Sequence, residues 1–228
     1  MIHIHNIKKM LNYCDVGIAP STFVKNIYSD HNILRNKWII IPPWIDPLLF
    51  PFHLSSTLKN TLLFVGPLIP AKGIDLLIDA LLIVERKIPF LTLHICGPGQ
   101  EITSADKKRI DQKIVALHST SVIFLGMKPL SELAKEYYTA TISITCPLWP
   151  EVFGQTWAQS LSCGTPTIVT AVGSIHELAA GKAVLVNPTQ SALAEGIITI
   201  LTNVPRKSKK TTFTLDNAFP SLLKVYNT

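Results

Sequence analysis

The sequence predicts an α/β protein built around a doubly wound parallel sheet, because short apolar runs alternate with helix-period segments along its 228 residues. Near-continuous apolar runs, such as "TLLFV" at 61–65, are typical of strands that are buried on both faces. Apolar residues make up 47% of the chain and charged residues 16%, so a globular protein is favoured over a disordered one.

The strands are expected at the short apolar runs, in this order: Val16–Ala19, Trp38–Ile41, Thr61–Val65, Leu91–Cys96, Ser121–Leu125, Thr141–Thr145, Thr167–Thr170 and Ala183–Val186. In the segment "GIDLLIDALLIV", apolar residues recur at helical spacing and share one face, which predicts a helix at about 74–84. The other helices are expected at about Ala105–Leu117, Ser131–Tyr138, Gly154–Ser162, Ile175–Ala179, Ser191–Leu201 and Ser221–Tyr226.

A proline-rich stretch divides the chain. The prolines of the segment "IIIPPWIDPLLFPFH" (39–53) cannot belong to a helix or a central strand, and we expect residues 46–53 to be a linker. Residues 1–45 are too few to close a core alone and are expected to be an incomplete α/β segment. Residues 54–205 are expected to form one complete Rossmann-like domain, and residues 206–228 a basic turn with a C-terminal helix.

The net charge of +6 raises the question of a polyanionic partner. The dense basic run, Arg206–Lys210, has no interleaved aromatic residues, so nucleic acid is not an expected partner. A solvated turn is the favoured interpretation, and peripheral contact with a membrane surface or another polyanion is the second.

The cysteines indicate a reducing compartment. Cys14, Cys96, Cys146 and Cys163 lie far apart and lack metal-ligand spacing, which favours reduced thiols in a cytoplasmic protein. No apolar run reaches the roughly 18 residues of a transmembrane span, and the N-terminus lacks the apolar core of a signal peptide.

Candidate site residues follow the strands, because ligands of doubly wound sheets bind beyond the carboxyl ends of the strands. Gly66 and Lys72 follow the first strand of the domain, and Lys72 stands just before a helix. A cation there suits a bound anion, with a solvated lysine as the equal alternative. Gly97 opens "GPGQE", which is a poor dinucleotide fingerprint but a plausible tight turn close to a ligand.

The segment "PLWPEVFGQTWAQSLSCGTPT" (147–167) places a carboxylate, Glu151, at the mouth of an expected helix. The free N–H groups near Phe153 and Gly154 suit a phosphate or a sugar oxygen. Glu151 can accept hydrogen bonds from sugar hydroxyls, so the pair suits a phosphorylated, hydroxyl-rich ligand. Glu177, in "AVGSIHE", fits the start of a surface helix on its pattern alone.

Five segments together resemble a known family. "FVGPLIPAKGIDLLIDAL", "HICGPG", "VIFLGMKPLSELAKEYYTA" and the segment from "PLWPEVFGQ" to "VGSIHE" occur in the order of the C-terminal domain of the retaining glycosyltransferases of family four, which have the GT-B fold. The segment "CDVGIAPSTFVKNIY…IIIPPWID" resembles the end of the family's N-terminal domain and its linker. Most of that N-terminal domain is expected to be absent from this chain.

The resemblance implies a nucleotide-sugar donor, transfer with retention of configuration, no cofactor and no metal in the site. Glu151 would be the catalytic residue that contacts the donor sugar, and Phe153 and Gly154 would hold the sugar through their backbone. Lys72 would bind the diphosphate. The residues implied at the remaining borders of the donor site are Gly66, Gly97, Gly126, Met127, Lys128, Gln159 and Glu177.

The chain departs from the family pattern in two site residues. Pro67 stands where the family has an arginine for the diphosphate, and Gln159 stands where it has a glutamate for the ribose. Both changes weaken donor binding. Two functions therefore stay open: a glycosyltransferase whose activity is low or needs a second chain with the missing N-terminal domain, and a non-catalytic nucleotide-sugar-binding subunit.

Overall fold

The computed structural model describes residues 9–11, 13–34, 37–53, 59–98, 103–203 and 213–226. Its main sheet has six strands, all parallel, in the order β5-β4-β3-β6-β7-β8. The strands are β3 (Thr61–Val65), β4 (Leu91–Cys96), β5 (Thr120–Gly126), β6 (Ile142–Thr145), β7 (Thr167–Thr170) and β8 (Val184–Val186). The fold class predicted from the sequence is confirmed.

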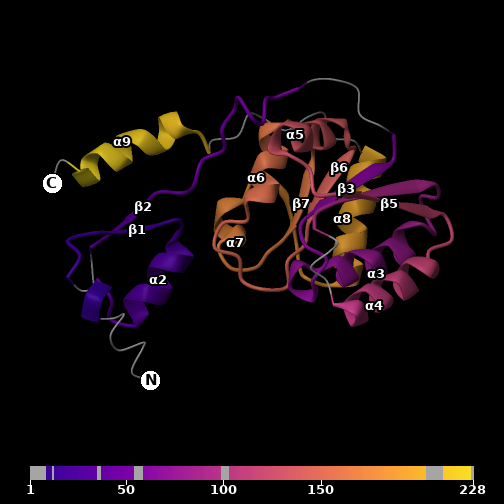
Figure 1. The fold of residues 1–228 in the computed structure, drawn as a ribbon, viewed down its shortest axis with the longest axis horizontal. Helices are drawn as coiled ribbons and strands as arrows, with labels where there is room; N and C mark the ends of the chain where they lie inside the picture. The colour runs from indigo at the N-terminus through magenta and orange to yellow at the C-terminus, as the bar shows by residue number, and fades with distance from the viewer. Residues whose placement is uncertain are drawn as a thin grey trace.

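Helices cover both faces of this sheet (Figure 1). One face packs against α3 (Ile74–Val84), α4 (Ser104–Val115) and α8 (Gln190–Asn203), and the other against α5 (Leu130–Thr139), α6 (Gln155–Ser162) and the short α7 (Ile175–Leu178). The strand residues alternate between two apolar clusters: Leu62 faces the α3 and α8 side, whereas Leu63 faces α5 and α6. This two-sided burial explains the apolar runs of the sequence.

The strand order reverses beside β3. The chain builds β4 and β5 on one side of β3, then crosses over to build β6, β7 and β8 on the other side. In a sheet of this type, the loops that follow the two strands at the reversal diverge and leave a crevice at the carboxyl edge. The switch point between β3 and β6 is therefore the expected place for a ligand.

The leading segment forms a small unit of its own. β1 (Gly17–Ala19) and β2 (Trp38–Ile40) pair in parallel and are joined by α2 (Thr22–Asp30). Figure 1 shows this unit beside the main domain, with α9 (Leu215–Tyr226) running back alongside it. The N–H of Ile45, at the end of the leading segment, donates to the carbonyl of Phe213, just before α9, at 2.8 Å.

The last helix is longer than the sequence predicted. It begins at Leu215 rather than near Ser221, because Pro220 lies inside the helix instead of ending it. The basic run 206–210 and the end of the "GPGQE" loop, residues 99–101, lie outside the described residues. None of the helices in the described part of the chain has both the length and the apolar character that crossing a membrane needs.

Candidate functional site

A cavity of about 380 Å³ opens at the switch point between β3 and β6. Its walls come from the two strand ends, from the loops that follow them and from the first turn of α6. The lining residues are Phe64, Val65, Gly66, Pro67, Lys72, Thr145, Cys146, Pro147, Glu151, Val152, Phe153, Gly154, Gln155 and Thr156. Five of the residues singled out from the sequence (Gly66, Lys72, Glu151, Phe153 and Gly154) thus share one cavity.

Lys72 and Glu151 point toward each other across this cavity and form an ion pair. Among the described residues, Lys72 is the one cation in the cavity lining and Glu151 is the one carboxylate. Both side chains are partly exposed, at 38% for Lys72 and 20% for Glu151. An exposed pair of this kind is worth about 0–1 kcal/mol, so an incoming anion can displace the carboxylate from Lys72 at little cost.

The backbone around Gly73 fixes the position of Lys72. Lys72 ends a short 3-10 turn, η1 (Pro70–Lys72), and Gly73 follows in a left-handed conformation with φ 75°. A Cβ at Gly73 would lie 1.8 Å from the carbonyl oxygen of Cys146, which leaves no space for any side chain. The loop after β3 can therefore lie directly on the end of β6, and this close approach directs Lys72 into the cavity.

The loop that carries Glu151 is held by bonds to its neighbours. The N–H of Leu148 donates to the carbonyl of Ala71 at 2.9 Å, and the Thr170 hydroxyl donates to the carbonyl of Pro147 at 2.7 Å. The N–H of Ser174 donates to the carbonyl of Glu151 itself at 2.9 Å. These bonds place the carboxylate at the cavity without using its own oxygen atoms.

The N-terminus of α6 faces the same cavity. Gly154 is the residue that precedes the helix; it has φ 73°, and no side chain caps the helix. The Phe153 ring is buried against Trp157 and Phe213, so this residue can offer only its backbone to a ligand. An uncapped helix start with exposed N–H groups suits phosphate or sugar oxygens.

Gly97 lies next to the cavity rather than in its lining. A Cβ on Gly97 would lie 2.1 Å from the carbonyl oxygen of Gly66, so the two backbones touch at the carboxyl ends of β4 and β3. The N–H of Gly97 in turn donates to the carbonyl of Gly126 at 3.0 Å. The three glycines form a continuous backbone edge that leads away from the cavity along β3, β4 and β5.

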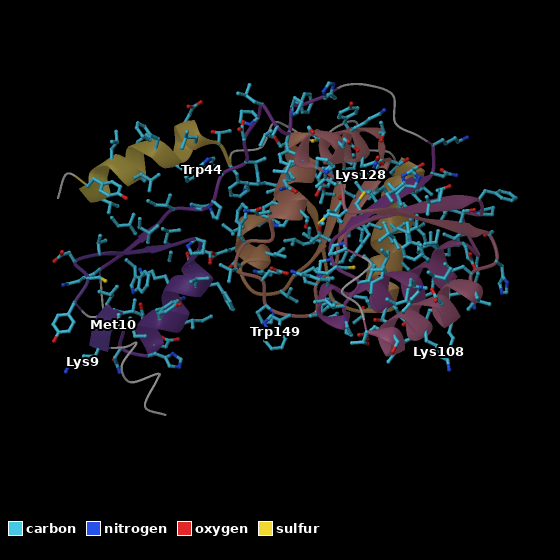
Figure 2. The ribbon with its side chains drawn as sticks, viewed as in Figure 1. Lys9, Met10, Trp44, Lys108, Lys128 and Trp149 are labelled. Atoms are coloured by element: carbon cyan, nitrogen blue, oxygen red, sulfur yellow. The ribbon has the colours of Figure 1, made fainter. Side chains whose placement is uncertain are left out.

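Met127 and Lys128 lie beyond that edge and outside the cavity lining. The Met127 side chain is exposed. Figure 2 shows Lys128 beside α5, where its ammonium lies 3.3 Å from a carboxylate oxygen of Glu136. The hydrogen bond to Glu136 raises the pKa of Lys128 above its ordinary value.

Two further predicted residues bind protein groups instead of lining the cavity. The amide oxygen of Gln159, which is buried, accepts a hydrogen bond from the Tyr137 hydroxyl at 3.1 Å. A carboxylate oxygen of Glu177 accepts the backbone N–H of Thr22, the first residue of α2, at 2.6 Å. Glu177 therefore lies at a contact between the leading segment and the main domain.

Sequence reasoning did not single out the hydroxyls of the cavity. Thr145 ends β6, Thr156 lies in the first turn of α6, and their hydroxyl oxygens are 3.2 Å apart. Their positions, at the end of an expected strand and at the start of an expected helix, are the sequence signal that could have identified them. Cys146 also lines the cavity, and burial raises the pKa of its thiol to about 12, so the thiol is neutral near neutral pH.

Known structures of the same fold contain a domain of this kind. Sucrose-phosphate synthase from Thermosynechococcus elongatus matches 99% of this chain, and 61% of its own, with a TM-score of 0.82 and 22% identity. The Anabaena protein HepE in complex with UDP matches 99% of this chain, and 67% of its own, with a TM-score of 0.84 and 17% identity. The fold is that of the Rossmann-like C-terminal domain of GT-B glycosyltransferases.

The chain belongs to the family described as glycosyl transferases group 1, whose model matches residues 48–212. An uncharacterized glycosyltransferase of Methanocaldococcus jannaschii is 27% identical over 164 residues, which are 72% of this chain and 42% of that protein. Mannosylfructose-phosphate synthase of Agrobacterium fabrum is 26% identical over 178 residues, 71% of this chain and 39% of that enzyme. The chain thus spans about two fifths of the length of these relatives.

Proposed function

We propose that this chain binds a nucleotide sugar in the cavity between β3 and β6 and serves as the donor half of a retaining glycosyltransferase of family four. The observation that carries the proposal is the Lys72–Glu151 pair, which brings a cation and a sugar-binding carboxylate together at the switch point of the sheet. A nucleotide sugar has a diphosphate for the cation and an adjacent hydroxyl-rich ring for the carboxylate, so both groups must lie close together. Membership of the glycosyl transferases group 1 family supports the same conclusion.

In this proposal, donor binding replaces the Lys72–Glu151 ion pair with an ion pair between Lys72 and the diphosphate. The diphosphate takes the Lys72 ammonium, and the Glu151 carboxylate is freed to accept hydrogen bonds from the sugar hydroxyls. The uncapped start of α6, at Gly154, offers its N–H groups to the remaining oxygens. Little binding energy is lost in the exchange, because the original pair is partly solvated.

During transfer, the bond between the anomeric carbon and the diphosphate breaks, a bond from that carbon to the acceptor oxygen forms, and the proton of the acceptor hydroxyl passes to the departing diphosphate. Negative charge grows on the departing diphosphate, where the Lys72 ammonium and the helix start lie. Groups that are fixed in place before the reaction stabilise such charge most effectively. The proposed chemistry uses no metal and no cofactor, and the configuration of the sugar is retained.

The relatives support a nucleotide-sugar donor. HepE was crystallised with UDP and with UDP-glucose, and mannosylfructose-phosphate synthase is named for a sugar phosphate product. Because the chain spans only part of these relatives, the acceptor half belongs to the proposal: a polypeptide with that half, from this or a second chain, completes the cleft. We further propose a cytoplasmic location with peripheral membrane contact through the basic run 206–210.

A non-catalytic nucleotide-sugar-binding subunit is the second candidate. Pro67 lines the cavity at a position where an arginine would supply a second cation. The amide oxygen of Gln159 is engaged by Tyr137. Both observations indicate that the donor is bound weakly and that its sugar is transferred inefficiently. A chain that binds a donor without transferring its sugar would fit them.

A thermal-shift screen with UDP-glucose, GDP-mannose and ADP-glucose tests the proposal. We expect one of them to raise the Tm of the protein, and Lys72→Ala to abolish that rise. The matched control, Lys108→Ala, removes an exposed lysine from α4 (Figure 2) and should leave the rise intact. Three nucleotide sugars without any effect, or an equal rise in Lys72→Ala, would contradict a donor site in this cavity.

A further inference from the structure

The N-terminus of α2 is docked on the main domain by two side chains of the segment 174–177. Ser21 precedes α2, and its hydroxyl oxygen lies 2.7 Å from the hydroxyl oxygen of Ser174, with both side chains fully buried. The backbone N–H of Thr22 donates to the Glu177 carboxylate at 2.6 Å. Two adjacent groups of α2 are thus bound by two residues that lie one helical turn apart.

Helix α2 lacks a carboxylate of its own at this end. Its first turn contains no acidic residue, although the partial positive charge of a helix start favours one. The Ser21 hydroxyl accepts the N–H of Val24 at 3.1 Å, which satisfies one free donor. Glu177, from the main domain, accepts a second N–H, that of Thr22, and supplies the negative charge that the first turn of α2 lacks. The contact therefore recognises the N-terminus of a helix.

The same segment also holds Glu151. The N–H of Ser174 donates to the carbonyl of Glu151 at 2.9 Å. Gly173 has φ 55°, and a Cβ there would lie 2.7 Å from both the nitrogen and the oxygen of the Glu151 backbone. Because the two backbones touch and share this hydrogen bond, a shift of residues 173–174 would be transmitted to Glu151.

The short helix α7 extends this connection to the start of α6. Ile175 is fully buried, and its Cδ1 lies 3.5 Å from the place of a Cβ on Gly154. A shift of Ser174 and Ile175 would therefore disturb both polar elements that we assign to the donor: the Glu151 carboxylate and the uncapped helix start. The leading segment and the cavity are linked through one short stretch of backbone.

We propose that Ser174 and Glu177 are positioning residues: they bind the N-terminus of α2 and thereby hold Glu151 in place for the donor sugar. This inference rests on the proposed function only for the identity of the ligand. Undocking of α2 loosens residues 173–177 and leaves the Glu151 carboxylate less well directed. The Lys72 side of the cavity, which lies on the loop after β3, keeps its geometry.

Binding of a nucleotide and of its sugar conjugate separates this role from a general loss of stability. We expect Ser174→Ala and Glu177→Ala to raise the ratio of the Kd of UDP-glucose to the Kd of UDP by about three- to tenfold. GDP-mannose with GDP serves as the second pair. Glu177→Gln keeps an acceptor for the Thr22 N–H, so the ratio should be partly restored. The control Glu195→Ala, at an exposed position of α8, should leave the ratio unchanged.

Hydrogen exchange tests the connection without any ligand. Glu177→Ala should speed amide exchange in peptides that cover Thr22–Val24 and also in those that cover Ser174, whose N–H is bonded to Glu151. Peptides from β3 should exchange as in the unmodified protein. Faster exchange in α2 alone, or an unchanged Kd ratio in a protein that binds both ligands, would overturn the inference. A protein that binds neither nucleotide sugar would contradict the proposed function instead, and the exchange data would still decide the positioning role.

Discussion

The Lys72 ammonium and the Glu151 carboxylate are paired across the switch point of the sheet, although 79 positions separate them in the sequence. Each residue is held by its backbone: Lys72 by the turn that ends at Gly73, and Glu151 by the bond from Ser174. The two charges therefore stay close together whether or not they bind each other. A ligand with an anionic part and a hydroxyl-rich part can engage both.

Removal of the two charges should affect the binding of a nucleoside diphosphate differently. Lys72→Met should weaken binding of a nucleoside diphosphate by about ten- to a hundredfold, because a charge-assisted hydrogen bond of about 1.5–3 kcal/mol is lost. Glu151→Gln should leave that binding unchanged or tighten it, because the carboxylate no longer competes for Lys72. Calorimetric titration with UDP and GDP measures both. Equal weakening in the two variants would show that Glu151 contacts the diphosphate or supports the fold.

A second cation should strengthen the site. Pro67 lines the cavity, and Pro67→Arg would add a planar fork of donors for the diphosphate. We expect nucleotide-sugar affinity to rise by at least about tenfold, measured by calorimetry. Pro67→Ala is the matched control, since it makes the same backbone change without a charge. If the arginine variant shows no gain over the alanine variant, the cavity is not built for a diphosphate.

The Gln159 position should respond differently. Because this side chain is buried and bonded to Tyr137, Gln159→Glu places a charge where water is scarce. We expect a lower free energy of unfolding in urea, by about 1–3 kcal/mol, for the ligand-free variant. Tyr137→Phe in the same background should lower it further, because the buried carboxylate would lose its hydrogen-bond donor. A variant as stable as the unmodified protein would mean that residue 159 reaches solvent or ligand freely.

Close backbone contact at Gly73 should make this position intolerant of any side chain. Both Gly73 and Gly181 have positive φ, at 75° and 70°, but a Cβ at Gly181 would meet nothing within 4 Å. Gly181→Ala should cost only the left-handed strain of about 1–2 kcal/mol. Gly73→Ala must in addition push Cys146 away and move Lys72, so its Tm should fall further and its nucleotide binding should be lost. Equal Tm values for the two variants would contradict the close approach.

Glu85 should confer acid-sensitive stability. Burial raises the pKa of this carboxyl group, but hydrogen bonds from His118, Ser119 and Thr120 outweigh burial, so the pKa is lowered overall. A lowered pKa in the folded state stabilises the protein above the pKa of the unfolded chain, and this stabilisation is lost as the pH falls through the folded value. Glu85→Gln should therefore cost about 1–3 kcal/mol at neutral pH, by urea unfolding, and progressively less in acid. A cost that does not change with pH would contradict this.

The sheet could be predicted because its strands are recognisable locally. β3 is apolar after Thr61 and β4 has apolar residues at four of its six positions, and the bounds of both strands were predicted to the residue. The start of α9 could not be predicted by the same rules, because Pro220 lies inside the helix and is not at its end. Local sequence patterns thus predict elements whose apolar residues are buried, such as β3. They fail where a residue that usually ends a helix, such as Pro220, lies inside one.

The site could be predicted only as far as it depends on loop position. Gly66, Lys72 and Glu151 share a cavity because they follow two adjacent parallel strands, and that follows from topology. The partners of Gln159 and Glu177 could not be predicted, since they are Tyr137, on another helix, and Thr22, in the leading segment. Spacing in a sequence gives the position of a side chain but not the group that it binds.

A crystal structure of this chain grown with the nucleotide sugar that gives the largest thermal shift would show whether the cavity between β3 and β6 holds the donor. We expect density for the diphosphate between the Lys72 ammonium and the start of α6, with the sugar hydroxyls within hydrogen-bond distance of the Glu151 carboxylate. In that complex, the Lys72–Glu151 ion pair should be broken. A nucleotide bound elsewhere on the chain, with the Lys72–Glu151 pair intact in an empty cavity, would contradict a donor site at the switch point.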